Sequence, residues 1–331
     1  MFISMFGAVE SGVIYAIMAL GVYLTFRVLD FPDLTVDGSF VTGAAVAAIS
    51  IVNGVPPIYA TTLGAIAGFI AGCVTGLLHT KGKINALLSG ILMMTALYSI
   101  NLRIMGQPTL SMLNEKTIFS QLESVWAATG IDPFLNGLLA SFGLEQFPTT
   151  WAIVFVMIIV TVLIKFVTDF YLKTEVGLAV RAIGDNKKMI RSLSANTDTL
   201  TIVGVGISNG FVALSGALYA QLGEFSDVNM GIGMIVIGLA SVIIGEALFG
   251  KKTIARVTLA VICGAVIYRM IVTLALRVDF LDTGDMKLIT AIIVIIALVA
   301  PKILQLRREK KRRLEKRAQL GRQAGGEDSN A

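Results

Sequence analysis

Long runs of apolar residues, separated by short polar connections, occupy most of the chain. An α-helix rises about 1.5 Å per residue and the hydrocarbon core of a bilayer is about 30 Å thick, so about 20 apolar residues can cross it. The pattern predicts an all-α polytopic membrane protein with about nine hydrophobic segments. These segments are residues 5–26, 34–52, 58–78, 84–103, 149–168, 200–222, 232–249, 254–275 and 286–305.

The second segment is the least regular of the nine. Pro32 and Asp33 lie at its start, and Asp37 and Ser39 follow within it. A carboxylate at the bilayer centre costs roughly 2.5–3.5 kcal/mol, and irregular backbone is tolerated there where it lines a polar cavity. We therefore expect this segment to be discontinuous and to face such a cavity. Alternatively, both aspartates lie at the cytoplasmic interface and simply start the helix.

Lysine and arginine concentrate in alternate connections between the segments. Cytoplasmic loops carry an excess of these residues, whereas the long connection 104–148 has four acidic residues against Lys116. The N-terminus is therefore predicted outside and the C-terminus inside, with 104–148 extracellular and loop 169–199 cytoplasmic. The basic positions on the cytoplasmic side are Arg27, Lys81, Lys83, Lys173, Arg181, Lys187, Lys188, Arg191, Lys251, Lys252 and Arg256.

Composition agrees with a membrane protein. Hydrophobic residues make up 55% of the 331 positions and charged residues only 15%, against about 25% in ordinary soluble domains. The net charge of +5 comes from residues 307–322, which hold nine Lys/Arg and two Glu. We therefore expect a transmembrane domain over 1–305 and a basic cytoplasmic tail over 306–331, and no nucleic-acid-binding body. The tail could bind anionic lipid or contact a cytoplasmic partner.

Residues that support catalysis or metal binding are scarce. His79 is the single histidine, and Cys73 and Cys263 lie in apolar stretches, so neither a metal site nor a disulfide framework is expected. The sequence from Gly245 to Lys251 has the spacing of a phosphate-binding loop. However, Lys252 stands where that motif needs a Ser or Thr for Mg²⁺. We predict a chain that is not an enzyme and holds no cofactor.

Polar and small residues within the segments have two interpretations. Glycines at four-residue spacing in the third segment place one bare stripe on a helix, which predicts close packing within the chain or against a second copy. Asparagines and serines in the fourth and sixth segments either bond neighbouring helices or line a path. These positions are Gly64, Gly68, Gly72, Gly76, Asn85, Ser89, Asn101, Ser208 and Asn209.

The cytoplasmic loop 174–196 is predicted to form two short helices. Thr174 can cap the first, and Val176, Val180 and Ile183 form its apolar stripe. Gly184 is expected to end this helix and Asp185 to begin the second. An apolar stripe with exposed basic residues indicates a docking surface; the alternative is a segment that lies on anionic lipid.

The same loop carries a family resemblance. Its sequence GLAVRAIGDN (177–186) resembles the cytoplasmic coupling segment of ABC importer permeases of the branched-chain amino acid and sugar class. SNGFVALSGALYA (208–220) and GIGMIVIGLASVIIG (231–245) resemble the same family. RVLDFPDLTVDGSF (27–40), LLHTKGKIN (77–85) and TALYSINLRIMG (95–106) resemble a bacterial subgroup linked to amino acids such as tryptophan or tyrosine.

The resemblance implies a transport subunit in a bacterial plasma membrane. A separate cytoplasmic ATPase dimer would bind ATP and Mg²⁺, an extracellular or periplasmic binding protein would deliver the solute, and two permease chains, most simply identical, would line one path. The residues implied in ATPase coupling are Glu175, Gly177, Val180, Arg181, Gly184, Asp185 and Asn186. The positions considered for the path are Asp37, Ser39, Asn85, Ser89, Ser208 and Asn209, with Phe40, Met93, Met94 and Tyr98 as possible walls.

Two other function classes remain open from the sequence. An ion-coupled secondary transporter would use a carboxylate within the membrane, and Asp37 is the natural candidate. A membrane enzyme or a structural assembly protein is disfavoured by the scarcity of catalytic residues. Dependence on ATP rather than on an ion gradient would separate the importer from the secondary transporter.

Overall fold

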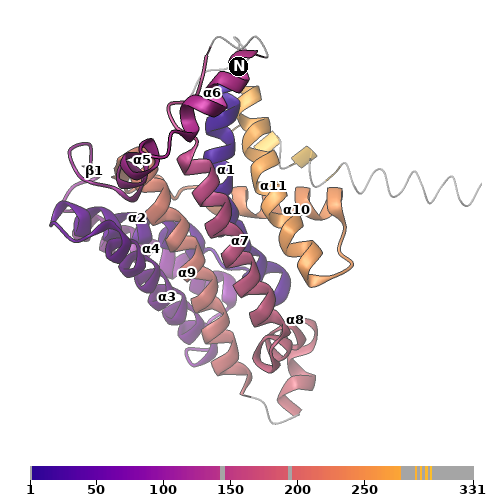
Figure 1. Ribbon diagram of the computed structural model, residues 1–331. Coiled ribbons are helices and arrows are strands. Elements are labelled where there is room, and N and C mark those ends of the chain that lie inside the picture. The colour runs from indigo at the N-terminus through magenta and orange to yellow at the C-terminus, as the bar shows by residue number, and fades with distance from the viewer. Residues whose placement is uncertain are drawn as a thin grey trace, which may run out of the picture.

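A computed structural model describes residues 2–141, 146–192 and 196–276, with a few further positions between 288 and 299. The described chain is an elongated bundle of helices (Figure 1). Its helices and strands are α1 (Phe2–Tyr23), the π-helical turn η1 (Leu24–Val28), α2 (Thr35–Val52), α3 (Pro57–Thr80), α4 (Ala86–Met105), β1 (Thr109–Ser111), α5 (Ile118–Ala127), α6 (Ile131–Ser141), α7 (Ala152–Lys173), α8 (Glu175–Ser192), α9 (Thr197–Gly223), β2 (Phe225–Asp227), α10 (Met234–Phe249) and α11 (Ile254–Ala275).

The predicted all-α membrane architecture is confirmed. Seven helices within the described residues are long and apolar enough to cross a bilayer: α1 with η1, α2, α3, α4, α7, α9 and α11. Each coincides with one predicted segment. α1, α2 and α9 are the most buried of the seven and form the centre of the bundle.

Two of the nine predicted segments are not established as full spans. The seventh coincides with α10, which has 16 residues. At about 1.5 Å per residue this helix falls short of the hydrocarbon thickness of about 30 Å. The ninth, 286–305, lies largely outside the described residues, and so does the basic tail. The count of nine and the orientation therefore stay predictions.

The charge pattern is reflected in which connections meet at each end of the bundle. β1 and β2 pair antiparallel, with Leu110 opposite Ser226, so the connections after α4 and α9 lie at one end. At the other end, Lys83 from the turn between α3 and α4 lines the same pocket as Lys187 and Arg191 of α8. Figure 1 shows α8 at the end of the bundle opposite the N-terminus.

The expected discontinuity within segment 34–52 is wrong. α2 is one uninterrupted helix, and the irregular backbone precedes it, between η1 and Thr35. No break is needed because the Asp33 carboxylate finds two donors: it accepts from Thr35 N (2.9 Å) and from Asn209 Nδ2 (2.6 Å). Since Asn209 lies near the middle of α9, α2 begins inside the bundle rather than at its end.

The glycine stripe of α3 lies against α2 and α9. A Cβ at Gly64 would meet Gly43 O, one at Gly68 would collide with Ala213, and one at Gly76 would meet Ile202 Cα at 2.7 Å. Backbones this close leave no room for side chains. The stripe therefore packs within the chain and is unavailable to a second copy.

Replacing Gly68 by leucine is expected to destabilise the protein strongly. Its side chain would collide with Ala213 and with Asn209 O, and overpacking of this kind costs about 1–3 kcal/mol or more. We expect the melting temperature in detergent to fall by about 5 °C or more. Gly210→Ala on α9 is the control, because its Cβ would meet nothing closer than 3.5 Å. Equal melting temperatures for Gly68→Leu and the natural chain would contradict this packing.

Candidate functional site

Asp37 joins the starts of two helices inside the bundle. It lies in the first turn of α2, and its carboxylate accepts from Gly233 N (3.0 Å) and Ile235 N (2.8 Å) at the N-terminus of α10. A carboxylate is stabilised there by the positive end of the helix dipole and by the unpaired N–H groups of the first turn. The close approach is possible because Gly231 packs directly against the backbone of Asp37.

A cavity of about 380 Å³ opens beside this junction. The loop before α10 contributes Val228, Gly231 and Ile232, and α4 contributes one long wall. The volume suits a small organic solute, since ligand pockets commonly measure about 300–1,000 Å³. The remaining lining residues are Asp37, Gly38, Val41, Met94, Thr95, Tyr98, Ser99 and Asn101.

The α4 wall is polar where a lipid-facing helix would be apolar. Thr95, Tyr98 and Ser99 are exposed at the surface of the chain, and Asn101 is buried behind them. Polar side chains within membrane helices usually face the interior of an assembly or a water-filled cavity. This face of α4 is therefore better suited to a solute path than to lipid.

The six predicted path residues occupy different environments. Asp37 lines the cavity, whereas Asn85 caps α4 by accepting from Leu87 N (2.9 Å) at the α8 end of the bundle. Ser89 is buried and donates to Asn85 O (3.0 Å). Ser208 donates to Gly21 O across the α1–α9 contact (2.6 Å).

The other two residues, Ser39 and Asn209, are buried away from this cavity. Asn209 holds Asp33 in place and donates to Val205 O at 3.0 Å. The structure thus brings together only Asp37 from the predicted set, with Met94 and Tyr98 from the predicted walls. Thr95 and Ser99 were missed; their spacing of four residues, which places both on one face of α4, is the signal that could have indicated them.

The predicted helix pair in loop 169–199 is present as α8. Thr174 caps its start, since Gly177 N donates to Thr174 Oγ1 at 3.2 Å. The predicted break at Gly184 and Asp185 is misplaced: the backbone leaves the helix at Asn186 (φ −156°, ψ 87°). Asn186 then caps the second part by accepting from Met189 N at 3.1 Å.

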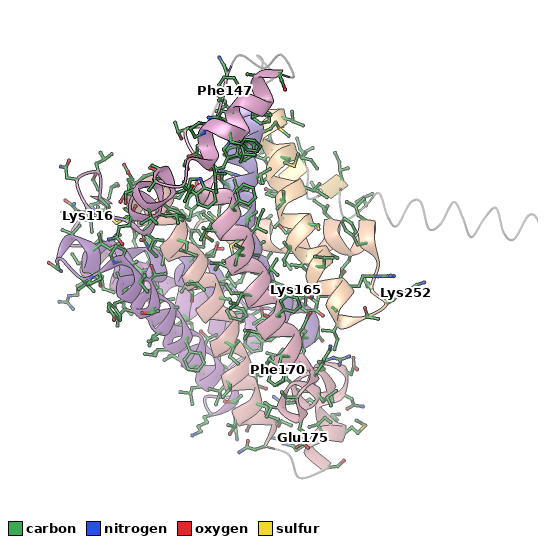
Figure 2. The ribbon with its side chains drawn as sticks, in the orientation of Figure 1. Lys116, Phe147, Lys165, Phe170, Glu175 and Lys252 are labelled. Carbon is green, nitrogen blue, oxygen red and sulfur yellow. The ribbon has the colours of Figure 1, made fainter. Side chains whose placement is uncertain are left out.

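α8 packs closely against the membrane helices through its glycines. A Cβ at Gly177 would collide with Tyr171 O at the end of α7, and one at Gly184 would collide with Val28 O at the end of η1. The side chains of Val180 and Ile183 are buried against the membrane helices. Figure 2 shows Glu175 at this end of the bundle, beyond Phe170 and Lys165 on α7.

Three apolar side chains of α8 are about half exposed at this end of the bundle. Val176, Leu178 and Met189 are 47%, 52% and 50% exposed. Val176 therefore does not extend the buried stripe formed by Val180 and Ile183. Apolar groups among the exposed Arg181 and Lys188 are typical of a surface that a partner covers.

An ion-pair cluster holds the C-terminal end of α10 against η1. Arg27 of η1 contacts Glu246 at 2.5 Å, and Lys251 contacts the same carboxylate oxygen at 2.8 Å. Arg27 precedes Val28, the residue on which Gly184 packs. α10 is thus fixed at Asp37 by its first turn and at η1 by its last.

Candidate metal ligands are scattered. Among the described residues, no group of three or more His, Cys, Asp or Glu side chains could hold a metal ion.

The chain is similar in sequence to known transport proteins. Residues 4–299 match the family described as the permease component of branched-chain amino acid transport systems. The chain is 45% identical over 282 residues to a tyrosine transport system permease protein of Clostridioides difficile, covering 85% of this chain and 86% of the relative. It is 33% identical over 299 residues to an uncharacterised protein of Rickettsia prowazekii, covering 89% and 96%. No solved structure matches the chain significantly.

Proposed function

We propose a function for this chain, which belongs to the family of branched-chain amino acid transport permease components. It is the membrane subunit of an ATP-driven importer of tyrosine or a similar aromatic amino acid. The observation that carries this proposal is the 45% identity to a tyrosine transport system permease along most of both chains. A multi-pass protein of this family resides in a bacterial inner membrane. The same family assignment favours a transport subunit over the ion-coupled alternative.

The cavity beside Asp37 is the proposed translocation site. Apolar walls from Val41, Met94 and Ile232 suit an aromatic side chain, and the polar groups of α4 suit the charged end of an amino acid. The polar wall lies on the exposed side of α4, so a second permease copy placed against it would close the path from the lipid. Two identical chains are the simplest such arrangement.

α8 is the proposed docking element for the ATPase. Val176, Leu178 and Met189 would enter a groove on a cytoplasmic ATPase subunit, where ATP and Mg²⁺ are bound. Movement of that subunit would reach the membrane helices through the contact of Gly184 with Val28. An external binding protein would deliver the solute at the opposite end, where β1 and β2 pair. The basic tail, 306–331, would bind anionic lipid.

Replacing Leu178 by glutamate is expected to weaken the copurification of the ATPase at least about tenfold. The change places a charge among the apolar groups of a desolvated contact, where loss of one well-buried anchor costs about 2 kcal/mol or more. The measurement is the amount of ATPase retained on the tagged permease from detergent-solubilised membranes.

Val125→Glu is the matched control for this substitution. Val125 lies on α5 and is 70% exposed at the other end of the bundle, so the same charge there should leave copurification unchanged. Full retention of the ATPase by Leu178→Glu would remove α8 as the docking element.

A further inference from the structure

We infer that the cavity beside Asp37 recognises the primary ammonium group of its solute, and that the solute's carboxylate contributes little to binding there. This inference rests on the proposed function and refines the chemistry of its translocation site. It depends on the hydrogen-bonding capacity of the lining residues.

Asn101 supplies the first observation. Its side chain is fully buried, and Nδ2 donates to Gly38 O at 3.2 Å. Among the described residues no donor reaches its Oδ1, which is shielded from water within the cavity lining, so a solute reaches it once the neighbouring side chains shift. A buried amide oxygen left without a donor costs about 1–3 kcal/mol, so a solute that donates a hydrogen bond there would be favoured.

Asp37 supplies the second observation. Each of its carboxylate oxygens accepts one N–H from the start of α10, and a carboxylate oxygen can accept two hydrogen bonds. The N–H of Met234 also interacts with this carboxylate, so at least one acceptor position stays available beside the cavity. The hydroxyl groups of Thr95 and Ser99 add further acceptors on α4.

The charge of the lining completes the assignment. Asp37 is the single ionisable carboxylate among the described lining residues, and none of those residues is a lysine, arginine or histidine. An ammonium group offers three donors and a positive charge, which match these acceptors. A carboxylate would find hydroxyl and amide donors but no cation, so it is predicted to lie toward the open side of the cavity.

The described walls define the remainder of the solute. Val41, Met94, Tyr98 and Ile232 surround the acceptors with apolar surface. The predicted ligand is therefore a primary amine with an apolar or aromatic body, a class that includes tyrosine. Its decarboxylated amine keeps the recognised group, whereas N-acetyltyrosine lacks it.

The test measures equilibrium binding of radiolabelled tyrosine to the full-length permease–ATPase complex in lipid nanodiscs without binding protein. Unlabelled tyramine is expected to compete within about threefold of tyrosine, and N-acetyltyrosine at least about tenfold more weakly, because a hydrogen-bonded charge is lost. Asn101→Leu should raise the dissociation constant about tenfold, since its side chain cannot accept a hydrogen bond.

Two serines on α4 provide a matched pair that keeps the test informative if Asn101→Leu folds poorly. Ser99→Ala, within the cavity, should weaken tyrosine binding by a few fold, about one neutral hydrogen bond. Ser89→Ala, buried outside it, should leave binding unchanged.

Three results would overturn the inference: N-acetyltyrosine competing as well as tyramine, equal effects of the two serine substitutions, or no tyrosine binding at millimolar concentration. ATP-driven tyrosine uptake by the same complex in proteoliposomes distinguishes a failure of this inference from a failure of the proposed function. If uptake proceeds, only the amine assignment fails; if the complex transports no aromatic amino acid, the proposed function fails.

Discussion

Replacing Asp37 by leucine is expected to reduce ATP-driven uptake at least about tenfold. The change removes the negative charge from the cavity and the carboxylate oxygens that accept hydrogen bonds from the start of α10. Gly233 N and Ile235 N would lose their partners inside the bundle, at about 1–3 kcal/mol for each buried group left unsatisfied. The measurement is the initial rate of substrate uptake into cells, normalised to the amount of permease in the membrane.

Asp37→Asn separates the two effects of that substitution. Its amide oxygen can still accept one N–H from the start of α10, so the melting temperature should stay closer to that of the natural chain than in Asp37→Leu. Uptake should still fall, since the charge is gone. Asp30→Asn is the control: Asp30 is exposed in the connection that precedes α2 and adopts a left-handed φ of 50° that asparagine tolerates. Normal uptake by Asp37→Leu would remove this residue from the path.

Replacing Gly184 by leucine is expected to reduce ATP-driven uptake about tenfold or more while the permease remains in the membrane. The side chain would collide with Val28 O, so α8 would have to move away from η1. A displacement of about 1 Å in a positioning element can cost about a hundredfold in rate. ATP hydrolysis by the assembled complex should persist and become uncoupled from uptake.

Gly137→Leu is the control for Gly184→Leu. Gly137 lies on α6, where an added Cβ meets nothing within 4 Å, so the same substitution should leave uptake and abundance unchanged. Coupled uptake at the natural rate by Gly184→Leu would show that the contact with Val28 does not transmit movement.

The segment boundaries could be predicted because hydrocarbon imposes a length and a composition on each helix. Predicted segment 254–275 and α11 have the same bounds, and segment 34–52 differs from α2 by one residue at its start. What could not be predicted is where α2 and α10 begin relative to the rest of the bundle. That depth depends on Asp33 meeting Asn209 and on Asp37 meeting Gly233, and such distant pairs leave no local pattern.

The candidate site was only partly predictable for the same reason. Intramembrane polarity indicated Asp37, Asn209 and Ser208 equally, yet Ser208 donates to Gly21 O and Asn209 donates to Asp33, so both are bonded across helix contacts. Only the fold distinguishes a bonded polar group from one that lines a cavity. In α8, Gly184 resembled a helix stop by residue type, but its small size serves the contact with Val28.

ATP-driven tyrosine uptake into proteoliposomes tests the central claim most directly. The vesicles would hold this chain with its ATPase, external binding protein and internal ATP, and parallel vesicles would lack the ATPase. Accumulation is predicted only with both the ATPase and ATP, and an ionophore that collapses ion gradients should not reduce it. Accumulation that proceeds without the ATPase and stops when the ionophore is added would contradict the account.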